Sequence, residues 1–544
     1  MKITLIFAML FSASLSFSQH DMYSSKEKSD AVLIPGLGNY SLRVSTDDKL
    51  AQKFFNQGLT LIYAFNHDEA IRAFKKAASI DPQLAMAYWG IAYSLGPNYN
   101  LPAGDEQRKT AYRYVKKALK HLKHASKKEK ELINALAKRY SKDLKIDQKE
   151  LNSKFRYAMK SLYEKYPDDP DIGTIYAESM MVLKPWQLWN NMGNPADDTE
   201  EIIKVLERIL ISYPNHPGAN HYYIHAVEAS KDPGRALKSA LVLKDLVPAA
   251  GHLVHMPAHT LFRVGDYAGA SEANINAIFS DEKYISTYKP TGFYPAMYYN
   301  HNINFLSVSR MMEGMFNESI KEAEKIGENT KLMMYEMQML ESYHANPVMI
   351  LISFNKWDEI LAFNVPDKDV NTYASLIHFA RALAFSKKGD LSEAEKELAL
   401  FSERKSIIKP EDVIGNNSAQ YINDLAGKII NANLMILKNE KSEAEILLRE
   451  AVEMEDKINY NEPPDWYPSV RLSLGKLLFS ENKFKESEAV FRDDLKKYPH
   501  NGRGLFGLYE SLKAQGKAEE SEKYLKEFQE AWKNSDFTLT MDKL

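Results

Sequence analysis

The sequence lacks cysteine throughout its 544 residues. This absence excludes disulfide bonds, a cysteine nucleophile and a lipid attached through cysteine after export. The formal net charge is only -3, so the strongly basic surface that favours nucleic-acid binding is missing as well. No stretch after the N-terminal run is long and apolar enough to cross a bilayer. We therefore expect no nucleic-acid partner and no membrane anchor.

Several short catalytic motifs are also missing. We find no glycine-rich phosphate loop, no nucleophile elbow and no His-Glu-x-x-His zinc-protease motif. The sequence therefore gives no support for a function that depends on one of these three motifs. The hydrophobic content of 44% and charged content of 26% are ordinary for a globular protein. A chain of this length is too long for one compact domain, so it is either multidomain or a solenoid.

The N-terminus has the pattern of a secretory signal. Lys2 is followed by the apolar run Ile3 to Leu15 and then by small residues. This order of cation, apolar stretch and cleavage site predicts a signal peptide over residues 1–18, with cleavage after Ser18. Residues 19–45 show no helical pattern and are expected to form an irregular leader. We predict that the mature protein is periplasmic or secreted.

From Asp47 to about Trp532 the sequence pattern is helical. Between Ala51 and Leu84, small residues, one aromatic residue and a proline recur at the spacings of a helical hairpin. These residues are Gly58, Ala70, Phe74, Ala77 and Pro82. Small residues allow two helices to approach, the aromatic ring fills the gap, and the proline ends the second helix. At these positions the chain resembles the tetratricopeptide (TPR) repeat superfamily, whose period is 34 residues.

The same spacing returns further along the chain. Ala236 and Ala270 are 34 residues apart, and so are Ser487 and Ser521. We count roughly ten helical hairpins, which predicts an all-α, TPR-type helical-hairpin solenoid wound as a right-handed superhelix. We expect an N-terminal array over residues 46–345, which bears a histidine-lined groove, and a C-terminal array over residues 346–544.

Five of the 14 histidines are concentrated in two short segments of the N-terminal array. They are His221, His225, His252, His255 and His259. Within each segment the spacings of three, four and seven residues place the histidines on one helix face. His221 and His255 are one TPR period apart, and so are His225 and His259. The two rows of imidazoles are therefore expected to lie side by side on neighbouring helices.

This arrangement predicts a metal site. The TPR resemblance implies that the histidine positions, and more weakly His301, line the concave surface of the solenoid. Neutral imidazoles bind divalent transition metals, so Zn, Cu or Fe is the expected ion. Five imidazoles are more than the three protein ligands of one open metal site. Either some of them only orient the ligands without binding the ion, or two metal ions bind. Pro257 should bend the helix that carries three of them. The alternative is a set of histidines that only hydrogen-bond to carboxylates, water or a peptide.

Three further residues are candidates for a catalytic role. Glu228 and Glu178 could be a ligand, a general base or an acceptor that fixes a histidine tautomer. Arg263 could bind a carboxylate, phosphate or sulfate, and a salt bridge to a neighbouring acidic residue is the alternative. Two aromatic-rich insertions, Lys184 to Asp198 and Ile285 to Tyr299, flank the histidines. Their rings either stack on a sugar or apolar ligand or pin the loops onto the helices, and we favour pinning.

The segments Asn220 to Glu228 and Gly251 to His259 resemble a family of exported bacterial TPR proteins. This resemblance implies export and a shared histidine-bearing groove. It implies no particular activity. We predict a repeat protein that binds a protein, peptide or glycan in its concave groove and holds a histidine-coordinated metal ion. The alternatives are a metal-dependent enzyme acting at the histidine cluster and an accessory protein of a polysaccharide-degradation system.

Overall fold

The computed structural model describes residues 31–366 and 369–544. The predicted signal peptide, residues 1–18, and residues 19–30 of the predicted leader lie outside the described residues. Residues 31–48 form turns and bends that lead into the first described helix. No helix in the described ranges has the length and apolar character of a membrane span. Beyond the leader the structure is helical, with one two-residue pair of strands.

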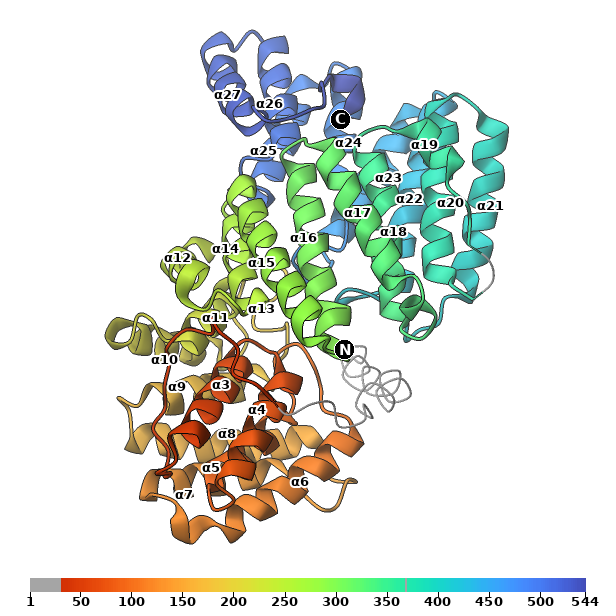
Figure 1. The fold of residues 1–544 in the computed structure, drawn as a ribbon. Helices are drawn as coiled ribbons and strands as arrows, with labels where there is room; N and C mark the ends of the chain where they lie inside the picture. The colour runs from red at the N-terminus through yellow and green to blue at the C-terminus, as the bar shows by residue number, and fades with distance from the viewer. Residues whose placement is uncertain (1–30, 367–368) are drawn as a thin grey trace. The chain divides into compact units, whose positions relative to one another are not determined.

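Contacts between residues divide the chain into two compact units. Figure 1 draws their helices as ribbons coloured by residue number. Unit 1 comprises the described residues up to Thr260 together with Ala273–Asn302, and unit 2 comprises Leu261–Glu272 and Ile303–Leu544. The array boundary that we expect between residues 345 and 346 lies inside unit 2, within a helix.

Unit 1 is built from consecutive helices that pack against their neighbours in sequence. They are α3 (Lys49–Tyr63), α4 (His67–Ile80), α5 (Ala85–Ser94), α6 (Asp105–Lys120), η1 (Leu122–His124), α7 (Lys127–Leu136), η2 (Ala137–Arg139), α8 (Gln148–Lys165), α9 (Pro170–Met181), α10 (Thr199–Ser212), α11 (Pro217–Val227), η3 (Pro233–Ala236), α12 (Leu237–Leu246), α13 (Gly251–His255) and the π-helical turn η4 (Tyr294–Tyr298). Three helices include residues of both units: α14 (Pro257–Arg263), α15 (Tyr267–Tyr288) and α16 (Tyr299–Met312).

Unit 2 continues the same pattern. Its elements are α17 (Phe316–Thr330), η5 (Met333–Tyr335), η6 (Gln338–Leu340), α18 (Glu341–Ser353), α19 (Trp357–Ala362), α20 (Asn371–Lys387), α21 (Leu391–Ile407), β1 (Val413–Ile414), β2 (Asn417–Ser418), α22 (Ala419–Leu437), α23 (Lys441–Glu455), α24 (Val470–Ser480), α25 (Phe484–Lys497), α26 (Gly502–Ala514), α27 (Ala518–Ala531) and η7 (Met541–Lys543). The strands β1 and β2 pair antiparallel.

The first hairpin shows why its sequence pattern produces this packing. Asp48 caps α3 by accepting hydrogen bonds from two backbone amides of the first turn. The fully buried ring of Phe74, on α4, lies between Gly58 on α3 and Gly90 on α5. A methyl group at Gly58 would lie 2.7 Å from that ring, and one at Gly90 would lie 2.6 Å from it. Only glycine therefore allows this close approach, and the predicted roles of the small and aromatic residues are confirmed.

The same device recurs near the end of unit 2. The ring of Phe491, on α25, faces Gly475 on α24 and Gly507 on α26. A methyl group at either glycine would lie within 2.6 Å of the ring. Phe491 is fully buried. The aromatic position of the repeat thus has the same packing function in both units.

The turn between α3 and α4 is unusual because Phe65 occupies its left-handed position, with φ of 54°. Phe65 donates its backbone N–H to Ile62, and Asn66 donates to Leu61, so the turn closes the end of α3. Glycine normally takes this position, since a side chain there is disfavoured. A phenylalanine in this conformation indicates that its ring has a specific place to fill.

Pro257 interrupts the helix that carries three of the clustered histidines. Helix α13 ends at His255 and α14 begins at Pro257. Proline has no N–H to donate to the carbonyl of Leu253, so the regular hydrogen-bond ladder cannot continue through it. The structure therefore has a helix boundary at Met256, which itself keeps a right-handed helical backbone with φ of -52° and ψ of -33°.

Candidate metal centre

Helix α11 carries the first two clustered histidines. His216 caps this helix by accepting the backbone N–H of Ala219 at 3.0 Å, and Pro217 occupies the first helical position. His221 and His225 follow one turn apart, and both side chains are buried. The sequence therefore starts the helix at a defined residue and directs both imidazoles to the interior of unit 1.

Helices α13 and α14 carry the other three. His252, His255 and His259 are also buried, with at most 2% of each residue exposed. The resemblance to TPR proteins implies histidines along a concave surface, whereas the structure places all five in the interior. Side chains from the turn after α3 and from both insertions pack against His221, His225 and His252.

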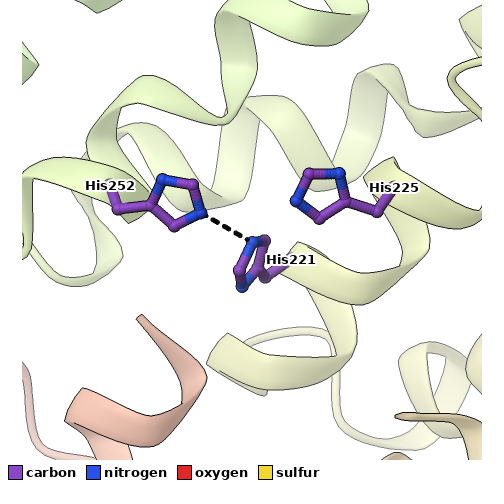
Figure 2. A group of neighbouring side chains, drawn as sticks. All are labelled: His221, His225 and His252. Carbon is purple, nitrogen blue, oxygen red and sulfur yellow. Dashed lines mark hydrogen bonds between the residues drawn. The ribbon is translucent and has the colours of Figure 1, made fainter. Parts of the chain in front are cut away.

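Three of the histidines form what we call the first histidine group: His221, His225 and His252. Figure 2 shows their rings turned toward one another, with His252 reaching the other two from a separate segment. The Nε2 atoms of His221 and His252 are 3.1 Å apart. The Nδ1 of His221 donates to the backbone oxygen of Tyr63 at 2.6 Å. Tyr63 ends α3, where carbonyl groups lack a helical partner.

The second histidine group consists of His255, His259 and His301. The Nε2 of His255 lies 2.8 Å from that of His259 and 3.1 Å from that of His301. On its other side, His255 contacts the Oδ1 of Asn274 through Nδ1 at 2.6 Å. His301, the weaker sequence candidate, is therefore brought to the cluster together with the five others.

Glu228 connects the two groups. One oxygen of its buried carboxylate accepts a hydrogen bond from the Nδ1 of His225 at 2.7 Å, and the other accepts from the Nδ1 of His259 at 2.5 Å. Burial by itself would raise the pKa of Glu228, but its electrostatic attraction to His259 and His225 and the hydrogen bonds from both rings outweigh burial and lower the pKa to about 2. An ionised carboxylate accepts only, so Nδ1 of each histidine carries the hydrogen and each Nε2 presents a lone pair.

Burial keeps the imidazoles in the form that binds metals. It lowers the pKa values of His221, His252 and His255 well below the usual range for histidine. It also lowers the pKa of His225, and that of His301 to about 3. At neutral pH these rings are therefore neutral, and neutral imidazole nitrogen is a ligand for transition metals.

The nitrogen positions fit a metal ion. Within each histidine group, one ligand atom per residue lies within 4.8 Å of the others. Two nitrogens on one tetrahedral zinc ion are roughly 3.3 Å apart, since Zn–N bonds are about 2.0–2.1 Å long. The observed separations of 2.8 and 3.1 Å are close to this value. Among the described residues, the buried Nε2 of His225 has no hydrogen-bond partner. Its lone pair therefore points into the group without accepting a hydrogen bond.

A third set of possible ligands has a different role. His225, Glu228 and His259 also lie close enough together to hold an ion. Their contacting atoms are already joined by two short hydrogen bonds, which occupy the Nδ1 hydrogens. We therefore assign Glu228 the role of orienting its two histidines rather than binding the metal.

Aromatic rings close the first histidine group from several directions. The ring centre of Phe65 is 4.5 Å from that of His221 and 5.4 Å from that of His252. Each insertion also contributes a ring. The ring centre of Trp186 is 5.7 Å from that of His225, and the ring centre of Tyr298 is 4.7 Å from that of His252. The insertions thus cover the histidines, as pinned loops would.

Several groups that contact the histidines were not predicted from the sequence. The acceptor at Tyr63 is a backbone oxygen, and Asn274 and Phe65 lie far from the histidines in sequence. A signal for Phe65 was available in principle, because a bulky residue stands where a helix of this repeat ends and glycine would be expected.

Two of the three candidate catalytic residues have their described contacts elsewhere. Glu178 accepts a hydrogen bond from the Tyr93 hydroxyl at 2.9 Å and lies 3.6 Å from a guanidinium nitrogen of Arg139, inside unit 1. Arg263 belongs to unit 2, where it lies over the ring of Tyr460. Glu228 contacts two of the histidines, His225 and His259.

A buried acid next to the start of α13 yields a pH-dependent prediction. Asp281 accepts hydrogen bonds from the Tyr294 hydroxyl and from Asn302, both at 2.8 Å. Burial raises its pKa to about 7. The folded state thus keeps a proton that the unfolded state has already lost above about pH 4, so this group's stabilising contribution declines as pH rises toward 7.

We expect Asp281→Asn to remove that decline. The free energy of unfolding of the wild type should fall relative to the variant by up to a few kcal/mol between pH 4 and 7. Urea unfolding at a series of pH values measures both curves. Parallel curves over this range would contradict a protonated Asp281.

Comparisons with known proteins agree with the fold. The tetratricopeptide repeat family model matches residues 51–84. The chain carries a TPR repeat. Together with the helical architecture, this match confirms the predicted all-α, TPR-type helical-hairpin solenoid. A search of curated proteins finds no match to this chain.

Several solved structures match most of the chain at low identity. Human IFIT1, as a dimer with m7Gppp-AAAA, matches over 89% of this chain and 90% of its own, with 13% identity and a TM-score of 0.33. Yeast Tom70 matches over 88% and 97%, with 12% identity and a TM-score of 0.31. The APC/C hetero-tetramer Cut9-Hcn1 matches over 89% and 74%, with 12% identity and a TM-score of 0.28.

Proposed function

We propose that this protein is a ligand- or partner-binding TPR repeat protein that holds a transition-metal ion in the histidine cluster of unit 1. The observation that carries the proposal is the arrangement around Glu228. Its carboxylate takes the Nδ1 hydrogens of His225 and His259, so the Nε2 lone pairs of both rings are directed away from it. A ligand that accepts those lone pairs has to be a cation or a hydrogen-bond donor.

The contact between His255 and His259 favours a metal over a hydrogen bond. His259 donates through Nδ1 to Glu228, and His255 faces the Oδ1 of Asn274 through Nδ1. With these hydrogens in place, both Nε2 atoms present lone pairs to each other at 2.8 Å. Two lone pairs at this distance repel one another unless a cation or an extra proton lies between them. A metal ion accepts both lone pairs at once and therefore accounts for the contact.

The ligand set narrows the identity of the metal. Imidazole nitrogen suits Zn, Cu and Fe, whereas Mg²⁺ and Ca²⁺ prefer oxygen ligands. The sequence contains no cysteine, so thiolate ligands are excluded. We therefore propose Zn, Cu or Fe as the ion.

A metal-dependent enzyme is the second candidate function. The feature that favours it is the number of ligands, because each histidine group offers three imidazoles. Catalytic zinc sites commonly have three protein ligands and leave one position open for water or substrate. The residues themselves would then hold and orient the ion, while the ion would supply Lewis-acid chemistry when bound.

Metal analysis of the purified full chain tests the proposal. We expect at least about one Zn, Cu or Fe ion per chain after reconstitution and removal of loosely held metal. The double variant His225→Ala/His259→Ala should lose it. The surface double variant His121→Ala/His124→Ala is the control and should retain it. A wild-type chain that stays metal-free, or a cluster variant that keeps its metal while remaining folded by circular dichroism, would refute the proposal.

A further inference from the structure

We propose that unit 1 binds two transition-metal ions side by side, one in the first histidine group and one in the second. This inference rests on the proposed metal-binding function and adds the number and placement of the ions. The two groups share no residue, and each supplies three imidazoles.

The number of imidazoles argues against a single ion. Zinc is almost always four-coordinate in proteins and expands at most to five during catalysis. Six converging imidazoles therefore exceed what one such ion can bind. The short nitrogen contacts also separate into two sets, with His221 facing His252 in the first group and His255 facing both of its partners in the second. Two separate positions explain this division.

The roles of the opposite ring nitrogens support the same division. In the first group, Nδ1 of His221 donates to the Tyr63 carbonyl and Nδ1 of His225 to Glu228. In the second group, Nδ1 of His259 donates to Glu228 and Nδ1 of His255 faces Asn274. Each group thus has two rings whose Nδ1 atom is already bonded, which fixes the ring and leaves Nε2 for a metal.

Glu228 makes the two positions adjacent rather than independent. One of its oxygens orients a ligand of the first group and the other orients a ligand of the second. The ring centres of His225 and His259 are 5.4 Å apart, and those of His252 and His255 are 5.9 Å apart. Rings this close make the two candidate positions neighbours within unit 1.

Copper(II) is a suitable probe, because it binds imidazole strongly and its unpaired electron reports on a neighbouring ion. The metal-stripped full chain is reconstituted with Cu²⁺ and dialysed. Copper per chain is then measured by mass spectrometry, and the spins are counted by electron paramagnetic resonance. We expect about two Cu ions per chain, as the two groups require, with fewer countable spins than copper atoms because neighbouring spins couple.

Single substitutions separate the two positions. His252→Ala removes a ligand of the first group only, and His301→Ala one of the second group only. Each variant should fall to about one Cu per chain and show the full spin count of an isolated ion. The variant His121→Ala/His124→Ala removes two histidines that neighbour each other outside the two histidine groups. It should leave the wild-type result unchanged.

The possible outcomes distinguish this inference from the function on which it rests. One Cu per chain that is lost in His225→Ala/His259→Ala would overturn the two-ion site and leave the metal-binding function intact. No retained Cu, Zn or Fe would overturn both. Two Cu ions that persist in His252→Ala and in His301→Ala, or that disappear from the surface variant, would place the metal elsewhere and overturn the inference.

Discussion

Replacing Glu228 by glutamine is expected to weaken metal binding about 10- to 100-fold, although Glu228 is not itself a ligand. The carboxylate accepts a hydrogen bond from His225 and another from His259. A glutamine side chain has one oxygen and one NH₂ group, so it can accept from only one of the two rings. The other ring must turn or move its hydrogen to Nε2, and that nitrogen then cannot bind a metal.

Competition with a chromogenic chelator measures this loss directly. Glu200→Gln, the same change at an exposed position of α10, is the matched control and should bind metal like the wild type. Both variants should remain folded, because glutamine has nearly the volume of glutamate. An affinity for Glu228→Gln within about twofold of the wild type would show that the histidines do not depend on the carboxylate for their orientation.

The repeat period predicted part of this cluster correctly. His225 and His259 are one period apart and their rings are neighbours, 5.4 Å between centres, as expected for equivalent positions in adjacent repeats. His221 was expected beside His255 but makes its nitrogen contact with His252. His252 and His255 both precede the boundary between α13 and α14, and the one nearer the start of α13 meets His221.

Other parts of the site could not be read from a pattern. The TPR signature locates Gly58 and Phe74 because close packing demands particular residue types at particular spacings. The Tyr63 carbonyl that orients His221 is a backbone atom, available at the end of any helix. Phe65 stands at a left-handed turn position where glycine would be expected, and this signal marks an unusual residue without showing which side chains its ring contacts. Tertiary contacts of this kind need coordinates.

Phe74→Ala is expected to lower the free energy of unfolding of unit 1 by about 3–5 kcal/mol. The ring is fully buried, lies between two glycines and packs edge-to-face on Phe55 with ring centres 5.4 Å apart. Glycine neighbours have no side chain that could move into the space, so the cavity stays largely open. Hydrogen exchange of the amides in α3 and α4 measures the loss locally, and it should accelerate roughly a hundredfold or more.

Phe279→Ala is the matched control, since this phenylalanine is 69% exposed, and it should change the unfolding free energy by no more than about 0.5 kcal/mol. Equal effects of the two substitutions would contradict the packing role of Phe74. The loss at Phe74 should also reach the metal centre. Helix α3 ends at Tyr63, whose carbonyl orients His221, and Phe65 in the turn that follows packs on the first histidine group. We therefore expect Phe74→Ala to weaken metal binding at the first group more than at the second, whose oriented histidines contact Asn274 and Glu228 instead.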